Sequence, residues 1–363
     1  MRLLASASPG EVRVVAVDDG GLRDYALWRP GAPDGVGEVH RGRIIARVPA
    51  LAGAFVAIAG AEGFLPDSAG AAGATEGQVL AVRITRAAQS GKGPRLAVAA
   101  NVAPGVGPPI LLQRGPDPVT RLAALHPDAP VDADDAALAA ALRPALGGRL
   151  RLVACAFDDE TEAAVAALAE PAADLPGGLR CSIHPTPALT AIDVDLGAAS
   201  GTRGGKGAVH LAANRAAVPA LAQQIRLRNL SGAILIDFAG LSPKRRAALG
   251  PDLAAALAAD ALRPRLLGFT ALGLAEIVRP RVHPPLHELL AGPHAAGLAA
   301  LRRLAAEIAV RPDRAPVLRA APDVVAGLQD DAAARADLAR RAGRPLILRP
   351  DPALTPLGWR IEE

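Results

Sequence analysis

The sequence predicts a multi-domain protein of the mixed α/β class, and three observations lead to this prediction. Between residues 36 and 100, short apolar strands are broken by glycine at short intervals, which is typical of a five-stranded barrel. Between residues 175 and 290, strand-like apolar runs alternate with helical patterns, which is typical of a sheet covered by helices. The length of 363 residues is sufficient for two or three domains, each with its own core.

The N-terminal half predicts mainly strands. Residues 12–17 and 25–28 are strand-like and are joined by the turn Asp18-Asp-Gly-Gly21, so a small antiparallel sheet is expected to begin the chain. The strands expected in the barrel region are residues 42–48, 54–58, 63–66 and 78–84. Residues 101–150 are rich in alanine and proline, and they predict one helix over 134–146.

The C-terminal half predicts an α/β layer followed by a small α+β domain. In the layer, strands are expected around 179–184, 189–195, 232–238 and 264–270, and helices over about 208–228 and 242–260. Pro219 lies inside the first of these helices and is expected to kink it, because proline removes a backbone donor. In the last domain we expect helices over 298–310 and 332–342 and a strand over 345–348.

Composition excludes several classes of protein. The count of Lys and Arg exceeds that of Asp and Glu by 40 − 36 = 4, and the sequence pI of about 9.6 favours a polyanionic partner without requiring one. The two cysteines, Cys155 and Cys181, form no Cys-x-x-Cys motif, so neither a disulfide framework nor a cysteine zinc site is expected. No apolar run of about 18 residues occurs, so we expect no membrane segment and a cytoplasmic protein.

Two aspartates at the ends of apolar runs are the candidate metal ligands. Asp193 ends the run Leu189-Thr-Ala-Ile-Asp, and Asp237 ends Ile234-Leu-Ile-Asp. If the two strands are neighbours, both carboxylates face one spot, and Mg²⁺ is bound by one or two carboxylates together with substrate phosphates. Asp195 falls on the same strand face as Asp193, so it either ligates the ion directly or acts through water. A lone aspartate at a strand end is more often a helix cap or a solvated turn residue, but the pair suggests phosphodiester chemistry.

Motifs along nearly the whole chain resemble the ribonuclease E/G family, and they occur in the order in which that family carries them. In the barrel region, the motifs similar to the family's S1-type RNA-binding barrel are Gly37-Glu-Val-His-Arg-Gly-Arg-Ile44, Ala54-Phe-Val56, Gly63-Phe-Leu-Pro66 and Gly91-Lys-Gly-Pro-Arg-Leu96. Further along, the segments similar to the family's catalytic domain are residues 175–178, 186–195, 202–204, 224–230 and 236–238.

The resemblance implies a division of the chain into domains. An S1-type barrel with the oligonucleotide-binding (OB) fold is expected over residues 36–100, inserted in an RNase H-like subdomain made of residues 1–35 and 101–178. A DNase I-like α/β catalytic domain is expected over residues 179–290, and a small α+β domain over 295–363.

The resemblance also implies an activity, that of a magnesium-dependent endoribonuclease in RNA processing or decay. Such an enzyme cleaves single-stranded RNA and leaves 5′-phosphate ends. Asp193 and Asp237 would be the catalytic residues and would hold Mg²⁺, with Mn²⁺ as an alternative ion, and Asp195 would support them where the family carries asparagine. The family carries further acidic residues where this chain has Ala, Arg215 and Gly240. The alternatives are therefore an RNA-binding protein with weak or no nuclease activity, or a structural partner of an RNA-degrading complex.

Two phenylalanines of the barrel match the family's base-stacking pair. Phe55 and Phe64 are expected to stack RNA bases at about 1–3 kcal/mol each, although most phenylalanines fill cores. Ile58 replaces a neighbouring family aromatic, which implies a smaller stacking platform. The basic residues expected to flank the platform and contact phosphates are Arg41, Arg43, Lys92 and Arg95, although basic side chains on a barrel are usually only solvated. Further basic residues are expected to extend this positive charge around the catalytic layer, each one individually as ordinary surface charge: Arg226, Arg228, Lys244, Arg245, Arg246, Arg279 and Arg281.

Two departures from the family pattern limit the expected properties. Residues 96–109 leave no room for the subdomain with which the longer members of the family bind a 5′-monophosphate, so no preference for 5′-phosphorylated RNA is expected. The family's zinc-binding motif has its counterpart at Gly292-Pro-His-Ala-Ala-Gly297, where both cysteines are replaced. We therefore expect no zinc, and a monomer or dimer rather than a zinc-linked tetramer.

Overall fold

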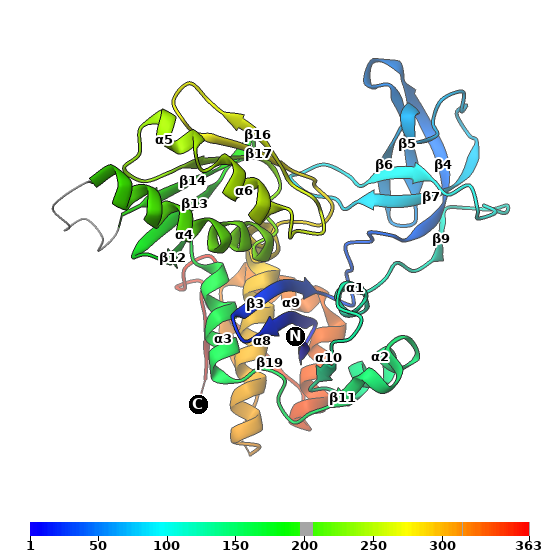
Figure 1. Ribbon diagram of the computed structural model, residues 1–363. Coiled ribbons are helices and arrows are strands. Elements are labelled where there is room, and N and C mark those ends of the chain that lie inside the picture. The colour runs from blue at the N-terminus through cyan, green and yellow to red at the C-terminus, as the bar shows by residue number, and fades with distance from the viewer. Residues whose placement is uncertain (197–205, 314, 363) are drawn as a thin grey trace. The chain divides into compact units, whose positions relative to one another are not determined.

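The computed structural model describes residues 1–196, 206–313 and 315–362, and it has the mixed α/β architecture that the sequence predicts (Figure 1). The chain divides into two compact units. Unit 1 consists of residues 1–33, 117–163 and 286–363, and unit 2 consists of residues 34–116 and 164–285. Within the described residues, no helix is both long and apolar enough to cross a bilayer.

Unit 1 begins with a mixed sheet of strand order β11-β10-β1-β2-β3. Its strands are β1 (Arg2–Ser8), β2 (Glu11–Asp18), β3 (Gly21–Trp28), β10 (Val131–Ala133) and β11 (Leu150–Leu152). The helices nearby are α1 (Pro118–Leu125), α2 (Ala136–Leu146) and α3 (Asp159–Ala166). Asp117 and Asp135 cap α1 and α2, since each side chain accepts a hydrogen bond from a backbone N–H in the first turn. The predicted strands 12–17 and 25–28 and the helix 134–146 are confirmed, whereas β1 was not predicted.

Unit 1 ends with helices packed on the small sheet β19-β18-β20. Its elements are α7 (Leu286–Leu289), α8 (Gly292–Val310), β18 (Val317–Ala320), α9 (Pro322–Asp330), α10 (Ala332–Ala342), β19 (Ile347–Pro350) and β20 (Trp359–Ile361). Leucines from the helices, including Leu301, Leu328 and Leu338, are fully buried between them. The predicted helices 298–310 and 332–342 lie in α8 and α10, and α8 begins earlier, at Gly292.

Unit 2 contains the predicted five-stranded barrel. Its strands are β4 (Val39–Val48), β5 (Gly53–Ile58), β6 (Ala61–Pro66), β7 (Val79–Arg86) and β8 (Arg95–Val98), with β9 (Ile110–Gln113) paired outside the ring on β4. The ring closes because β5 pairs with both β6 and β4. Two glycines allow this close packing, since a Cβ on Gly42 would lie 2.6 Å from Val56 and one on Gly63 would lie 2.7 Å from Leu96. Short 3₁₀ turns of this unit lie at Pro49–Leu51, Asp67–Ala69 and Ala167–Ala169, and a further one, Gly147–Arg149, belongs to unit 1.

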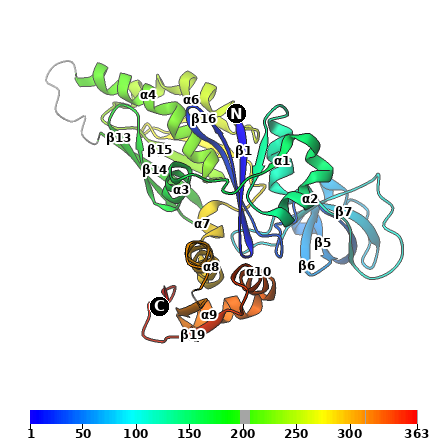
Figure 2. The same cartoon turned by 90° about the horizontal axis from the view of Figure 1, so that it is seen from below.

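The rest of unit 2 is an α/β layer of strand order β12-β13-β14-β15-β17-β16. Its elements are β12 (Ala172–Leu175), β13 (Leu179–Pro185), β14 (Leu189–Asp195), α4 (Lys206–Leu227), β15 (Gly232–Asp237), α5 (Pro243–Ala247), α6 (Gly250–Leu257), β16 (Arg265–Phe269) and β17 (Ala275–Arg279). α4 and α6 lie along the sheet (Figures 1 and 2). Val218, Leu221 and Ile225 of α4 join the sheet residues in one apolar core.

Two expectations for this layer need correction or qualification. The helix predicted over 242–260 is wrong as a single element, because the structure breaks it into α5 and α6. Pro251, in the first turn of α6, has no N–H with which to continue the hydrogen bonds of α5. By contrast, α4 extends through Pro219 as one helix.

Two arginines expected as surface charge are buried instead. Arg228 is 6% exposed, and its guanidinium donates to the backbone carbonyls of Leu168 and Glu170. Arg279 is 3% exposed, and its Nε lies 2.6 Å from Oδ2 of the buried Asp260. The expectation is therefore wrong for both, because each guanidinium finds acceptors that are distant in sequence and that the composition does not reveal.

The buried pair between Arg279 and Asp260 is expected to stabilise unit 2 strongly. We predict that Asp260→Ala lowers the free energy of unfolding by about 3–5 kcal/mol, because it leaves a buried guanidinium without its counter-ion. The control is Asp252→Ala, which breaks a solvated pair with Arg215 at 2.8 Å and should change stability by about 0–1 kcal/mol. Urea unfolding of both variants measures the difference, and equal effects would contradict the prediction.

Candidate functional site

The two strand-end aspartates lie side by side in the structure. β14 and β15 are neighbouring parallel strands, and their register sets Asp193 directly opposite Asp237. Along β14, Ile192 and Val194 point into the apolar core, so Asp193 and Asp195 lie on the opposite, exposed face. The side chain of Asp237 is 45% exposed, so the pair is accessible to solvent and to a ligand. The fold therefore brings together the carboxylates that the sequence singles out.

The carboxylates repel one another. Partial burial raises the pKa of Asp193 above its ordinary value, and the charges of Asp195 and Asp237 raise it further. His184 and Arg246 act in the opposite direction and lower it. The net result is a raised pKa, so burial and the two acidic neighbours together outweigh the two basic ones.

Arg246 is the countercharge of Asp237, a contact that the sequence did not reveal. Its Nη1 lies 2.6 Å from Oδ1 of Asp237, and Arg246 belongs to α5, the short helix that follows β15. The contact is an ion pair without hydrogen-bond geometry, because Oδ1 of Asp237 is buried and has no hydrogen-bond partner. Arg246 was expected as surface charge, and this expectation is wrong, since its side chain is only 16% exposed.

The donor set fits a magnesium ion held by few protein ligands. Within the residues that the structure describes, no three His, Cys, Asp or Glu side chains converge into one metal-binding group. Mg²⁺ commonly takes one or two carboxylates and keeps water or substrate oxygens for the rest of its shell. The opposed pair of carboxylates, on the exposed face of the strands, matches that requirement. The metal role of Asp193, Asp195 and Asp237 stays a prediction.

Asn214 is a buried polar residue beside this edge that the sequence analysis missed. It is fully buried in α4, and its Nδ2 donates to the carbonyl oxygens of His210 and Ala239 at 2.7 and 3.0 Å. These bonds tie α4 to the loop that follows Asp237. In the same loop, Gly240 has φ +60°, and a Cβ there would lie 2.5 Å from Nδ1 of His210. A polar residue inside an otherwise apolar helical face was the available signal.

The barrel carries the two predicted aromatic residues on its outer face. Phe55 and Phe64 are cross-strand partners on β5 and β6, with ring centroids 5.6 Å apart in an edge-to-face arrangement. Both are half-buried and lie outside the barrel core, so they are not simply core-filling residues. Gly53 makes room for the ring of Phe64, since a Cβ there would lie 2.4 Å from its Cζ. Ile58 is buried in the core, so the idea that it replaces part of the platform is wrong.

The predicted basic residues of the barrel differ in their exposure to solvent and in their hydrogen bonds. Arg43, Lys92 and Arg95 are exposed. Arg41 instead donates from Nε to the carbonyl of Pro104 at 2.6 Å and from Nη1 to that of Pro108 at 3.2 Å, so it holds a loop in place. The role of these residues in RNA binding stays a prediction.

Other predicted segments lie elsewhere. The motif at residues 202–204 is outside the described residues. The counterpart of the zinc motif begins α8, where His294 pairs with Asp331 at 3.0 Å.

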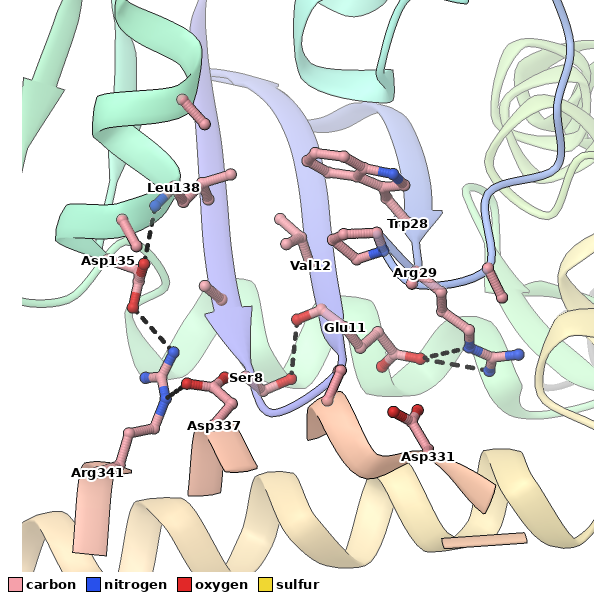
Figure 3. Close-up of a pocket in the computed structure, with 18 of the residues that line it drawn as sticks. Ser8, Glu11, Val12, Trp28, Arg29, Asp135, Leu138, Asp331, Asp337 and Arg341 are labelled. Atoms are coloured by element: carbon pink, nitrogen blue, oxygen red, sulfur yellow. Dashed lines mark hydrogen bonds and ion pairs between the residues drawn. The ribbon is translucent and has the colours of Figure 1, made fainter. Parts of the chain in front are cut away.

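A cavity of about 370 Å³ lies in unit 1, apart from these residues (Figure 3). It is lined by residues of β1, β2, β3, α2 and α10, with Trp28 on its wall. The charged groups around it satisfy one another: Arg341 pairs with Asp135 and Asp337, and Arg29 pairs with Glu11. None of the predicted site residues lines this cavity.

Comparison with known proteins identifies similarity in the α/β layer. Residues 154–282 match the sequence model for the Ribonuclease E/G family. Ribonuclease E of a Nostoc species is 37% identical over 128 residues, covering 35% of this chain and 18% of that protein. Ribonuclease G of Escherichia coli is 35% identical over 136 residues, covering 37% of this chain and 27% of that protein. The chain thus spans less than a third of the length of these relatives.

The raised pKa of Asp193 predicts a pH-dependent effect on stability. Above its folded-state pKa the ionised carboxylate destabilises the fold, whereas below the ordinary aspartate value both folded and unfolded states are protonated. Asp193→Asn should therefore be more stable than the wild type at neutral pH, and this advantage should shrink as the pH falls toward about 4.

Urea unfolding across this pH range tests the prediction. The control is Asp237→Asn, which also removes a charge but takes the partner from Arg246, so no gain is expected from it. A gain in Asp193→Asn that is independent of pH would show that repulsion between carboxylates is not its cause.

Proposed function

The chain belongs to the ribonuclease E/G family through residues 154–282, and from this premise we propose that it is a magnesium-dependent endoribonuclease acting on single-stranded RNA. Cleavage would serve RNA processing or decay and leave 5′-phosphate and 3′-hydroxyl ends. The observation that carries the proposal is the register of β14 and β15, which sets Asp193 opposite Asp237 on an exposed face. Both residues lie in the segment that matches the family.

Asp193 and Asp237 are the residues that would hold the ion, with Asp195 beside them. The opposed carboxylates favour a site completed by a divalent cation, as does the pKa of Asp193, which burial and the charges of Asp195 and Asp237 raise. When bound, the ion supplies electrostatic stabilisation of the charge that develops on the scissile phosphate. Arg246 places a guanidinium at the same edge, where it can donate to a phosphate oxygen.

The barrel supports a single-stranded substrate. Bases stack on exposed aromatic rings only when they are not stacked and paired in a duplex. Phe55 and Phe64 form such a surface, and the exposed Arg43, Lys92 and Arg95 supply charge for the backbone. RNA-binding by this surface is independent of the chemistry at the carboxylates.

The alternative is an RNA-binding protein with weak or no nuclease activity. Two observations favour it. Arg246 already forms an ion pair with Asp237. In addition, no three potential metal ligands lie together within the described residues. A cleavage assay separates the two functions.

We predict that Asp193→Asn and Asp237→Asn each lower the rate of cleavage of an end-labelled single-stranded RNA by roughly a hundredfold or more, because each removes a negative oxygen ligand. The assay contains Mg²⁺ and is repeated with a chelator, which should abolish cleavage. Asp174→Asn is the matched control, since Asp174 lies on the same sheet with its side chain 85% exposed. Cleavage that survives both substitutions would refute the endonuclease proposal, while RNA-binding could persist.

We predict separately that Phe55→Ala and Phe64→Ala each weaken binding of single-stranded RNA by about 1–3 kcal/mol, through loss of a stacking surface. Binding is measured without divalent ions, so that cleavage does not interfere. Leu51→Ala is the control, because it removes an apolar side chain of the same barrel that is 58% exposed and has no aromatic ring. An equal effect in all three variants would argue against base stacking.

A further inference from the structure

Three arginines of unit 2 come together without an acidic partner. Arg86 ends β7, Arg95 begins β8, and the two are register partners on neighbouring strands. Arg281 follows β17, and the backbone N–H of Ala87 donates to the carbonyl of Val282 at 2.8 Å. This bond makes the segment of Arg86 the neighbour of the segment of Arg281. Within the described residues, none of the three arginines forms an ion pair with a carboxylate.

The cluster is unfavourable for the protein alone. Arg86 is partly buried, and its Nε is buried without a hydrogen-bond partner. Burial lowers the pKa of Arg86, and the positive charges of Arg95 and Arg281 lower it further. A buried donor without a partner and three like charges are each relieved by a bound anion.

One member of the cluster, Arg281, also packs against a glycine. The guanidinium of Arg281 rests on Gly232, where a Cβ would lie 2.4 Å from its Nη2. Gly232 has φ +83°, a left-handed conformation that glycine adopts without strain. The guanidinium of Arg281 therefore lies against the backbone at the first residue of β15.

The cluster continues the aromatic surface of the barrel. Phe55 is the register partner of Phe64, and Phe64 is in turn the register partner of Arg95 on β8. Because register partners point to the same side of a sheet, the two rings and Arg95 lie in one row across β5, β6 and β8. Arg86 is the register partner of Arg95 at a point where the register of β7 shifts. The row sets positive charge beside the aromatic rings, and proteins that bind single-stranded nucleic acid combine these two kinds of side chain.

We propose that Arg86, Arg95 and Arg281 form a seat for an internal backbone phosphate of the RNA strand whose base stacks on Phe64. The inference rests on the proposed function, because it requires that the barrel binds single-stranded RNA. It assigns a role to Arg86 and Arg281, which the sequence analysis did not connect with RNA. The guanidinium groups of the two residues donate hydrogen bonds to the phosphate oxygens. Arg95 lies between them and the aromatic surface, because it is the register partner of both Phe64 and Arg86.

The test uses the full chain without divalent ions and 5′-hydroxyl oligouridylates in which one neutral methylphosphonate linkage is moved along the strand. Wild type should lose affinity when the neutral linkage occupies the seat. Arg86→Gln and Arg281→Gln should each bind the unmodified RNA more weakly, with a slope of log affinity against log salt that is shallower by about 0.7. In both variants the neutral linkage at that position should not lower the affinity further, because the arginine and the phosphate charge act through the same contact.

Two controls accompany the variants. Arg303→Gln removes the same charge from the exposed face of α8, where Arg303 pairs with Glu307 at 3.4 Å, and it should bind as wild type does. Arg86→Lys keeps the charge and should retain most of the salt dependence, which guards against misfolding as the cause of any loss.

Three results would overturn the inference. Wild-type salt slopes in Arg86→Gln and Arg281→Gln would refute the seat while leaving the proposed function intact. The same would follow if the neutral linkage weakened binding equally in wild type and in both variants. If the wild type failed to bind any single-stranded RNA, the proposed function itself would fail, and the inference with it.

Discussion

The parallel pairing of β14 with β15 is the constraint on which the candidate site depends. Because side chains alternate along a strand, a shift of one residue in register would turn one of the two aspartates into the apolar core. A parallel pair also requires a crossover connection, and α4 is the helix between the two strands. The apolar residues of α4 pack on Ile192, Ile234 and Ile236. This packing determines which face of the sheet is buried, and the carboxylates lie on the opposite face. The hydrophobic core thus sets the position of the charged edge.

Stability and chemistry make opposite demands at this edge. Asp193 is held close to two other carboxylates, and partial burial together with their charges raises its pKa. Arg246 compensates part of this charge, and Asn214 fixes the loop that follows Asp237. A site that was optimised for stability alone would carry one neutral residue here, as is common where a strained or charged arrangement serves function. The remaining imbalance is the property that a divalent cation would use.

Sequence patterns predicted those parts of the structure that depend on local periodicity. The glycine-broken strands of the barrel and the apolar runs ending at Asp193 and Asp237 are visible in the residues themselves. Strands β1 and β17 were missed, because short strands of mixed composition are recognised only when their pairing is known. The alternation of strand faces would also have placed Ile58 inside the barrel, since it lies three residues from Phe55 and therefore on the other face.

Contacts between distant residues could not be predicted in the same way. The pair of Arg246 with Asp237, the burial of Arg279 on Asp260 and the packing of Arg281 on Gly232 all depend on how strands and helices meet. Nothing in a run of basic residues distinguishes an arginine that is solvated from one that is buried. Charge counting therefore favoured a polyanionic partner, but it could not indicate which residues would face one.

β15 links the two charged features of unit 2. Gly232, at its first residue, supports Arg281, and Asp237, at its last residue, carries the candidate metal ligand. The two ends are about 16 Å apart, since a strand rises about 3.3 Å for each residue. A strand within a packed sheet does not change its length, so the separation between the arginine cluster and the carboxylates is fixed. An RNA bound at both places would have to reach over this distance, so the arginine cluster and the carboxylates would contact different nucleotides of one strand.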